Sequence, residues 1–89
     1  MTMQAVQVVL IPGRYHPKLA VDLEERADGW YGSLICGDNH GGYEPWRGPY
    51  GNPTACERNV AAFGARFLRA RGLLNHWRWL QRHYGWRMS

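Results

Sequence analysis

The clearest signal for the fold is the stretch Leu19-Ala-Val-Asp-Leu-Glu-Glu-Arg-Ala-Asp-Gly-Trp-Tyr-Gly-Ser-Leu-Ile-Cys36. Its first half alternates apolar and polar residues, which is the period of a strand with one buried face. Asp28-Gly29 is a strong signal for a hairpin turn, and 30–36 is expected to be the returning strand. Pairing Ala27 with Trp30 would place the apolar residues of both strands on one face. The stretch therefore predicts an antiparallel hairpin.

The segments on either side of this hairpin predict a further strand and a long loop. Val6–Ile11 is rich in β-branched residues and ends at Pro12-Gly13, which predicts another strand. Because this segment is apolar on both faces, we expect the strand to be central or covered. Residues 37–52 hold five glycines and two prolines, so we expect mostly loop, with a short edge strand near 42–47. A loop of this length in a small domain is often functional.

The C-terminal part of the chain predicts two helices. Thr54-Ala-Cys-Glu57 is a capping box, so the first helix should run from about Ala55 to Arg71. Gly72 would be its left-handed cap. Asn75 is expected to cap a second, shorter helix that ends at Gly85.

At 100° per residue, each predicted helix has an apolar side and a basic side. The first helix should bury Cys56, Val60, Phe63, Phe67 and Ala70. Its outer side should carry Arg58, Ala62, Ala65, Arg66 and Arg69. The second helix has an apolar stripe of Leu73, Trp77, Leu80 and Tyr84, with Arg78, Trp79, Arg82 and Trp86 pointing away.

The order of these elements predicts an α+β fold. We expect a three- or four-stranded antiparallel sheet, followed by a long helix packed on one face and a short C-terminal helix. A length of 89 residues suits a single domain over 1–89. No apolar run approaches the roughly 18 residues of a membrane span, and the start lacks a charged region or cleavage site. We therefore expect a cytoplasmic protein.

The charge of the chain is unevenly distributed. Residues 1–56 carry four basic and six acidic side chains, whereas 57–89 carry seven arginines and one carboxylate, that of Glu57. The C-terminal third, with a net charge of +6, should attract anions or an acidic partner. Arginine makes bidentate contacts and stacks on rings, although a GC-rich coding sequence would also produce an excess of arginine.

The basic helical faces are the strongest candidate site. Arginine interleaved with aromatic residues can anchor an acidic protein partner, or bind nucleic acid through phosphate contacts and base stacking. The predicted partner-binding residues are Arg58, Arg66, Arg69, Arg78, Trp79, Arg82 and Trp86, together with the loop aromatics Tyr43, Trp46 and Tyr50. The alternative is that the tryptophans fold over the sheet edge and the arginines form a solvated face.

Cysteine and histidine could carry chemistry, but their spacing gives little support for it. Cys36, Asp38 and His40 lie close together in the sequence, and Cys56 could join them. A structural zinc site usually shows two tight ligand pairs, and Cys36-x3-His40 is one partial pair. No motif with a known mechanism surrounds these residues. We expect buried thiols, no metal, no cofactor and no enzymatic activity, although the two cysteines could form a bridge.

The junction Gly42-Tyr-Glu-Pro-Trp-Arg-Gly-Pro-Tyr-Gly-Asn-Pro-Thr-Ala55 resembles a known one. It is similar to the "W-x-GP-F/Y…A" segment of small phage and mobile-element proteins. It also resembles the end of the three-stranded DNA-binding domains of phage integrase arms and plant ethylene-response factors. This resemblance implies base contacts from the exposed sheet face, which would here carry Ala20, Asp22, Glu24, Tyr31, Ser33 and Ile35. Because two acids on that face would repel phosphate, we carry over no contact residue.

In size and charge the chain is also similar to phage-borne anti-CRISPR inhibitors. We therefore expect a non-enzymatic, phage- or mobile-element-encoded protein that docks through the Arg/Trp/Tyr surface on a host protein or protein–nucleic-acid complex and blocks it. One alternative is direct DNA or RNA binding by the basic C-terminal helices. Another is a small metal protein or Cys/His enzyme. A homodimer would also use exposed aromatic residues, and no membrane partner is expected.

Overall fold

The computed structural model describes residues 3–37, 42–43 and 45–86. They form the strands β1 (Ala5–Ile11), β2 (Leu19–Arg26), β3 (Gly29–Cys36), β4 (Gly42–Tyr43) and β5 (Arg47–Tyr50), and the helices α1 (Pro53–Ala70) and α2 (Leu74–Tyr84). The strands β1, β2 and β3 pair in that order and antiparallel, and both β4 and β5 pair with the other edge of β3. This small domain confirms the predicted α+β fold.

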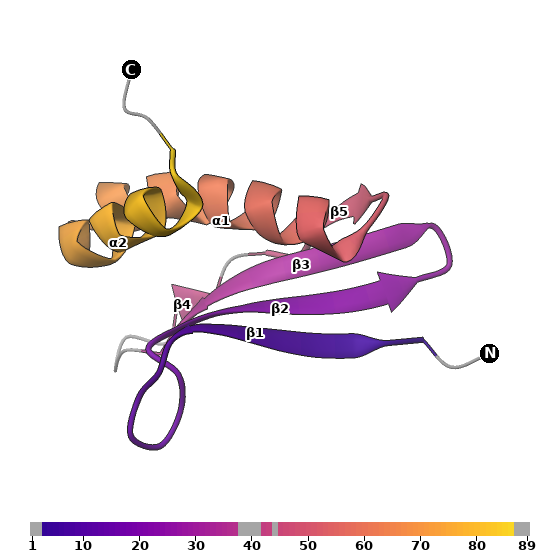
Figure 1. Cartoon of the computed structure of the whole chain (residues 1–89), viewed down its shortest axis with the longest axis horizontal. Coiled ribbons are helices and arrows are strands. Elements are labelled where there is room, and N and C mark those ends of the chain that lie inside the picture. The colour runs from indigo at the N-terminus through magenta and orange to yellow at the C-terminus, as the bar shows by residue number, and fades with distance from the viewer. Residues whose placement is uncertain (1–2, 38–41, 44, 87–89) are drawn as a thin grey trace.

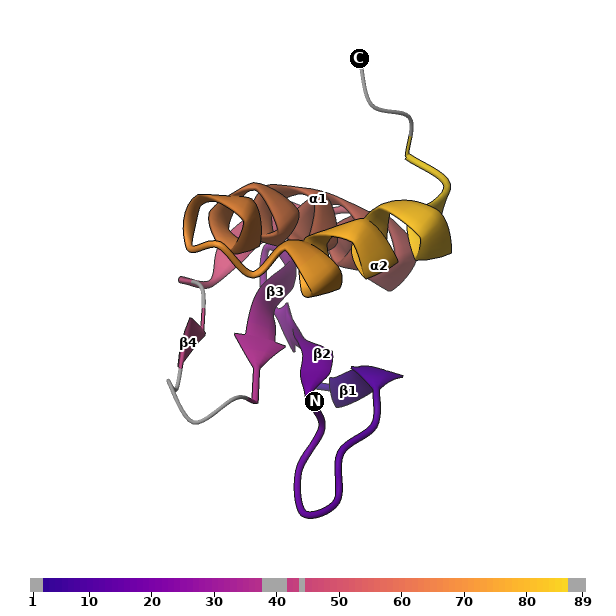
Figure 2. The same ribbon diagram turned by 90° about the vertical axis from the view of Figure 1, so that its left-hand side faces the viewer.

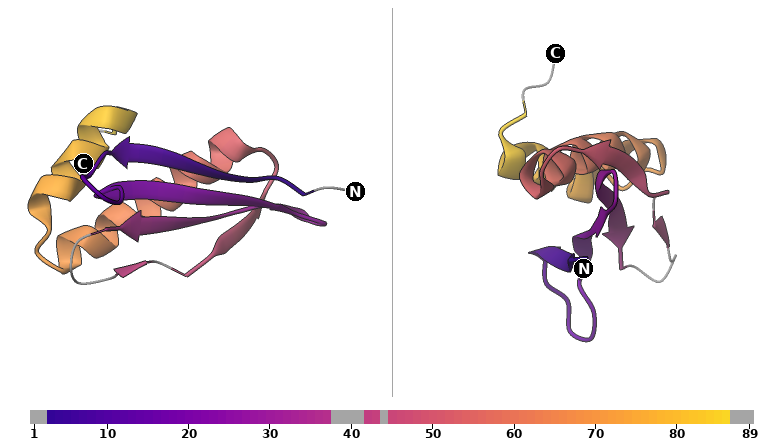
Figure 3. Two further views of the ribbon diagram at one scale, coloured as in Figure 1. Left: turned by 90° about the horizontal axis from the view of Figure 1, so that it is seen from below. Right: turned by 90° about the vertical axis from the view of Figure 1, so that its right-hand side faces the viewer.

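The helices cover one face of the sheet (Figure 1). Figure 2 shows α1 and α2 side by side in one layer above the strands. Seen from below, the opposite face of the sheet is not covered by a helix (Figure 3). The main core lies between the layers and consists of Leu10, Leu19, Val21, Leu23, Trp30, Leu34, Cys36, Cys56, Val60, Ala61, Ala65, Leu68, Trp77 and Leu80. None of the described helices is long and apolar enough to cross a membrane.

The β2–β3 hairpin has a different register from the one expected. Arg26 pairs with Gly29, so the turn consists of Ala27 and Asp28, and the expected pairing of Ala27 with Trp30 is wrong. The difference is a shift of two residues, which preserves the face of every side chain. Close packing of β5 accompanies the observed register, since a Cβ on Gly29 would lie 2.8 Å from the carbonyl oxygen of Tyr50.

β1 is an edge strand, so the expectation that it is central or covered is wrong. It pairs with β2 alone among the described strands. Val6 and Val9 are 48% and 50% exposed, whereas Leu10 is buried. Apolar residues on both faces of a strand usually indicate cover on both sides. Here, the helices cover one face only.

Small residues let α1 lie very close to β3. A Cβ on Gly32 of β3 would come within 2.9 Å of both Cys56 Sγ and Val60 Cγ2. One Cβ on Gly64 of α1 would overlap Leu34 Cδ2 and lie 3.0 Å from Leu34 Cβ. The helix therefore packs on the sheet through a stripe of small side chains.

This close packing turns α1 away from its predicted orientation. The buried residues are Cys56, Val60, Ala61, Gly64, Ala65 and Leu68. Phe63 and Phe67, expected in the core, are each 38% exposed, and Ala70 is exposed. Ala65, expected on the outer side, is buried. The physical reason is that two phenylalanine rings could not fit in the narrow space between α1 and β3.

The helix ends differ from the expectation at their N-termini only. Asn52 caps α1, since its side chain accepts a hydrogen bond of 2.8 Å from the backbone N–H of Ala55. Proline at the first helical position favours this earlier start, and the predicted Thr54 cap is wrong. Asn75 lies inside α2, and no side chain caps that helix. Gly72 follows α1 with the predicted positive φ, and α2 ends at Gly85 as predicted, also with positive φ at that glycine.

The contact between α1 and β3 predicts the effect of Gly64→Ala. Alanine favours a helix interior over glycine by about 1 kcal/mol, but overpacking costs roughly 1–3 kcal/mol. Because the new methyl would overlap Leu34, we expect a net loss of about 1–2 kcal/mol in the free energy of unfolding, measured by urea denaturation. Gly51→Ala, whose Cβ would meet no atom within 4 Å, should be neutral. A stable Gly64→Ala variant would show that the close contact is wrong.

Candidate functional site

The outward side of α1 carries exposed rings with arginines stacked on them. The guanidinium carbon of Arg47 lies 3.6 Å from the ring centroid of Phe63, and that of Arg71 lies 4.2 Å from the centroid of Phe67. Arg66 is exposed on the same side of the helix, one turn after Phe63. We call Arg47, Phe63, Arg66, Phe67 and Arg71 the aromatic–arginine face. It joins apolar surface to positive charge.

Stacking fixes the direction in which these guanidiniums can bind. A guanidinium that lies on a ring keeps its N–H groups in its own plane, where they can reach a carboxylate or phosphate. Arg47 comes from β5 and stacks on a ring of α1, so it connects the two layers. Its Nε is buried without a hydrogen-bond partner in the described part of the chain. Because this Nε is buried, Arg47 can offer only its Nη groups to an anion, whereas the side chain of Arg71 is exposed.

A second cationic surface lies between α2 and the loop before β2. It is a groove of about 480 Å³. We call it the α2 groove, and it is lined by Ile11, Lys18, Asn75, His76, Arg78, Trp79 and Arg82. None of these residues is acidic. Arg78 and Arg82 also line a neighbouring hollow with Gln81, Gly85 and Trp86, so both arginines lie on the ridge between two depressions.

The tryptophans of α2 are less exposed than the sequence indicated. Trp79 and Trp86 are half-buried and pack against the core. The Trp79 ring stacks on His83 with the centroids 4.4 Å apart, and the Trp86 ring stacks on Tyr84 with the centroids 4.9 Å apart. The prediction that both indoles point away from the domain is therefore corrected. Trp79 presents only part of its surface to the α2 groove.

Among the described residues, no carboxylate forms an ion pair with an arginine of α1 or α2. In the described residues, the only ion pair joins Arg26 and Glu24, both in the sheet, at 2.9 Å. Glu57, the carboxylate of the C-terminal third, accepts a hydrogen bond of 3.0 Å from the Tyr84 hydroxyl. Arg69 lies 5.0 Å from the ring of Trp77. These positive charges are therefore available to an anionic partner.

The other predicted contact residues do not share one surface with the helical arginines. Arg58 is exposed on α1. Trp46 is 43% exposed but belongs to the uncovered face of the sheet. Tyr50 is half-buried against the core. The backbone of Tyr43 is in β4, and its side chain lies outside the described part of the chain. The predicted contact residues are thus distributed over the helical layer and the sheet and do not form one continuous site.

The predicted cluster of cysteine and histidine lies only partly within the described residues. Asp38 and His40 lie outside the described residues, whereas Cys36 and Cys56 are buried as predicted. Burial raises the pKa of the Cys56 thiol, which disfavours the reactive thiolate. Within the described residues, no group of three His, Cys, Asp or Glu side chains could hold a metal ion. The Cys/His enzyme stays a prediction.

The structure adds functional candidates that the sequence did not indicate. The sequence predicted Phe63 and Phe67 in the core, and it did not indicate that Lys18 lies beside Asn75 and His76 of α2. The small pair Gly64-Ala65 was the signal for a differently oriented α1. No local signal connects Lys18 to α2, because that contact depends on how the layers pack.

Comparison of this chain with protein-family models, curated proteins and solved structures finds no match. The structure itself shows a small α+β domain with a basic helical layer. Its function is inferred from the aromatic–arginine face and the α2 groove.

The hydrogen bond between Tyr84 and Glu57 predicts how stability depends on pH. Burial, then the hydrogen bond to Glu57, raises the pKa of the Tyr84 phenol above its ordinary value of 10.0. A raised phenol pKa stabilises the fold below pH 10 and loses this effect as the pH rises. Tyr84→Phe should reduce the free energy of unfolding at pH 7 by roughly 1–2 kcal/mol, measured by urea denaturation.

This difference between wild type and Tyr84→Phe should shrink above about pH 10. The pKa of Tyr31, raised by its hydrogen bond to Asp28, affects both proteins. So does the raised pKa of Cys56. Their contributions therefore cancel in the difference. A difference that stays constant from pH 7 to pH 11 would contradict the assignment.

Proposed function

We propose that this protein is a non-enzymatic binding protein that docks through its aromatic–arginine face on an anionic, partly apolar surface of a host protein or protein–nucleic-acid complex. The observation that carries this proposal is the pair of exposed phenylalanine rings on α1, each with a guanidinium stacked on it. Docking would block the partner by occupying its surface. The proposal includes a phage or mobile-element origin and action in the host cytoplasm.

The energetics of interfaces support this assignment. Large apolar side chains beside arginine are typical of the few residues that dominate binding energy. An exposed phenylalanine gains transfer free energy when a partner covers it. Arginines that are already stacked lose less side-chain freedom on binding than free ones. The aromatic–arginine face therefore offers apolar burial, charge pairing and partial preorganisation in one place.

The test combines charge reversal with removal of one ring. Arg66→Glu with Phe67→Ser should abolish capture of the partner from extract of the native host, because both the charge and an apolar contact are lost. Arg66 is exposed and Phe67 is 38% exposed, so the double variant should stay folded, with a melting temperature lowered by roughly 4–8 °C for each kcal/mol of lost packing. Arg14→Glu, an equal change of charge in the exposed loop before β2, serves as the matched control.

Capture is run with and without nuclease. The proposal expects a partner that survives nuclease treatment, depends on Arg66 and Phe67, and is retained by Arg14→Glu. Capture that is unaffected by the double substitution would reject the aromatic–arginine face as the docking site.

Direct binding of nucleic acid is the second candidate, and the α2 groove favours it. Lys18, Arg78 and Arg82 place three permanent positive charges around one groove that has no acidic lining residue. Phosphate contacts need charge rather than deep apolar pockets, so the half-burial of Trp79 does not weaken this candidate. Asn75 and the partly exposed indole could add contacts to bases.

Salt dependence tests this second candidate. If the groove neutralises about three phosphates of duplex DNA, the affinity should fall with a slope of roughly −3 in log–log form. Arg78→Glu with Arg82→Glu should abolish the shift of a labelled duplex, whereas Arg66→Glu should retain most of it. No retardation of duplex or single-stranded probes by the wild-type protein, or a flat salt dependence, would eliminate this candidate.

A further inference from the structure

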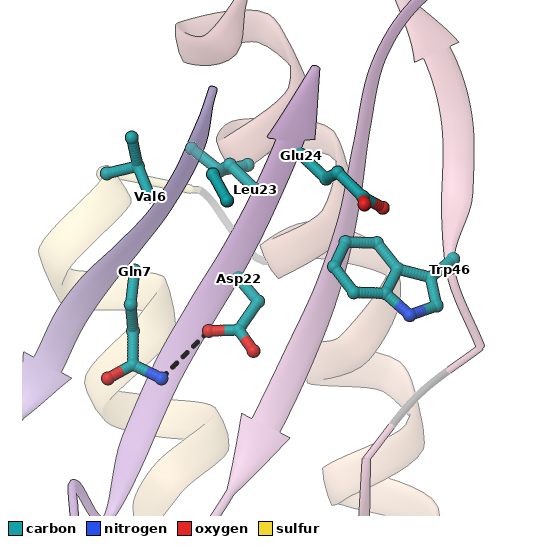
Figure 4. A pocket seen from close by; sticks show the side chains of 7 residues that line it. Val6, Gln7, Asp22, Leu23, Glu24 and Trp46 are labelled. Carbon is teal, nitrogen blue, oxygen red and sulfur yellow. Dashed lines mark hydrogen bonds between the residues drawn. The ribbon is translucent and has the colours of Figure 1, made fainter. Parts of the chain in front are cut away.

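A hollow of about 370 Å³ lies on the side of the sheet that the helices leave uncovered. We call it the sheet hollow, and it is lined by Ala5, Val6, Gln7, Asp22, Leu23, Glu24 and Trp46. Figure 4 shows the indole of Trp46, which comes from the segment before β5, extending toward the carboxylate of Glu24 on β2. The sheet hollow therefore combines two carboxylates with one aromatic ring, which is the chemistry that recognises an organic cation.

Both carboxylates are fixed in position and keep an oxygen for a ligand. Asp22 Oδ1 accepts a hydrogen bond of 2.8 Å from the side chain of Gln7 (Figure 4). Glu24 Oε2 accepts from Nε and Nη2 of Arg26 at 3.0 and 2.9 Å. In the described part of the chain, the second oxygen of each carboxylate accepts no hydrogen bond. The two groups are thus oriented without being saturated.

The chain already binds one guanidinium with two of the groups that line the sheet hollow, Glu24 and Trp46. The guanidinium carbon of Arg26 lies 4.2 Å from the ring centroid of Tyr31 and 5.4 Å from that of Trp46, and Glu24 pairs with it at 2.9 Å. The Tyr31 hydroxyl donates to Asp28 at 2.7 Å, which holds the ring in place. Arg26 therefore shows that Glu24 and Trp46, together with Tyr31, accept a planar cation.

One guanidinium does not balance the negative charge at this end of the β2–β3 hairpin. Asp22, Glu24, Glu25 and Asp28 carry four negative charges and Arg26 one positive charge. The arginines of α1 and α2 lie in the other layer (Figure 1). The remaining field attracts a further cation to the sheet hollow.

We propose that the sheet hollow binds an arginine side chain from a basic peptide segment of a partner, with the guanidinium against Trp46 and its N–H groups on Asp22 and Glu24. Arginine fits better than lysine because a planar guanidinium can stack on the indole and contact both carboxylates at its edge; Arg26 already combines contact with Trp46 and an ion pair with Glu24. This surface is separate from the proposed docking surfaces, and its residues lie on the opposite layer of the domain.

The probe is a capped pentapeptide, acetyl-Gly-Ser-Arg-Gly-Ser-amide, titrated into ¹⁵N-labelled protein. We expect saturable shifts of the Trp46 indole N–H and of the amides of Gln7, Asp22 and Glu24. The same peptide with citrulline in place of arginine, which has the same shape without the charge, should bind at least about tenfold more weakly. Equal binding of the two peptides would overturn the proposal.

Substitutions then locate the site. Asp22→Asn and Trp46→Ala should each weaken binding by about three- to tenfold. Glu25→Gln removes the same charge from the neighbouring position, whose side chain points to the other face of the strand, and should change affinity by less than about twofold. Spectra of each variant establish that it is folded. Loss of affinity in Glu25→Gln equal to that in Asp22→Asn would mean general attraction to negative charge and would overturn the proposal.

Arg26→Gln gives the sharpest test, because Arg26 competes for the groups that the peptide needs. Its removal should tighten peptide binding by about threefold or more. Lys18→Gln makes an equal change of charge outside the sheet hollow. The change that it causes in the logarithm of the peptide affinity should be less than half of the change caused by Arg26→Gln. Weaker binding after Arg26→Gln would overturn the proposal. Salt-sensitive dimerisation of the protein alone, abolished by Asp22→Asn, would make a second copy the occupant and would also overturn it.

Discussion

The close approach of α1 to β3 is the constraint on which the rest of the structure depends. Gly32 on the strand and Gly64 on the helix leave no space for a methyl group between the two elements. A helix held this closely must present small residues to the sheet, so its large residues turn outward. Phe63 and Phe67 therefore lie at the surface, where Arg47 and Arg71 stack on them. A packing requirement of the core has thus created the aromatic–arginine face.

The same two-layer arrangement separates the charges of the molecule. The carboxylates of the β2–β3 hairpin lie in the sheet, and the arginines of α1 and α2 lie in the helical layer, with the core between them. Glu57 is the acidic side chain of the C-terminal third, and it bonds to Tyr84. The helical arginines have no carboxylate partner within the described residues, and two of this group, Arg69 and Arg71, lie over aromatic rings instead. Such stacking holds a guanidinium in place but leaves its charge uncompensated.

Local patterns predicted what depends on neighbours in sequence. Alternation and turn residues gave the order of elements, the faces of β2 and β3 and the ends of both helices at Gly72 and Gly85. The errors concern contacts between elements. The observed register of the β2–β3 hairpin differs from the predicted one by two residues, and β5 packs on Gly29 at this turn. The observed orientation of α1 differs from the predicted one because a periodicity analysis places the most hydrophobic residues in the core. The space beside Leu34 admits only small residues. The α2 groove could not be predicted because Lys18 is distant from α2 in the sequence.

The orientation of the two helices also explains why Trp79 and Trp86 are half-buried although they were expected at the surface, and why Phe63 and Phe67 are exposed although they were expected in the core. α2 has α1 and the sheet on its inner side, so Trp77 and Leu80 are buried, and the flanking Trp79 and Trp86 lie half-buried at the margin. On α1, the small-residue stripe fills the contact with the sheet, and no room remains for its aromatic rings. The large apolar side chains exposed in the helical layer are thus two rings on α1, Phe63 and Phe67, and one leucine on α2, Leu74, so α1 offers more apolar surface and α2 offers mainly charge. An anionic partner that is partly apolar would thus be bound by α1, and a purely charged one by α2, because burial of apolar area and pairing of charge contribute to binding separately.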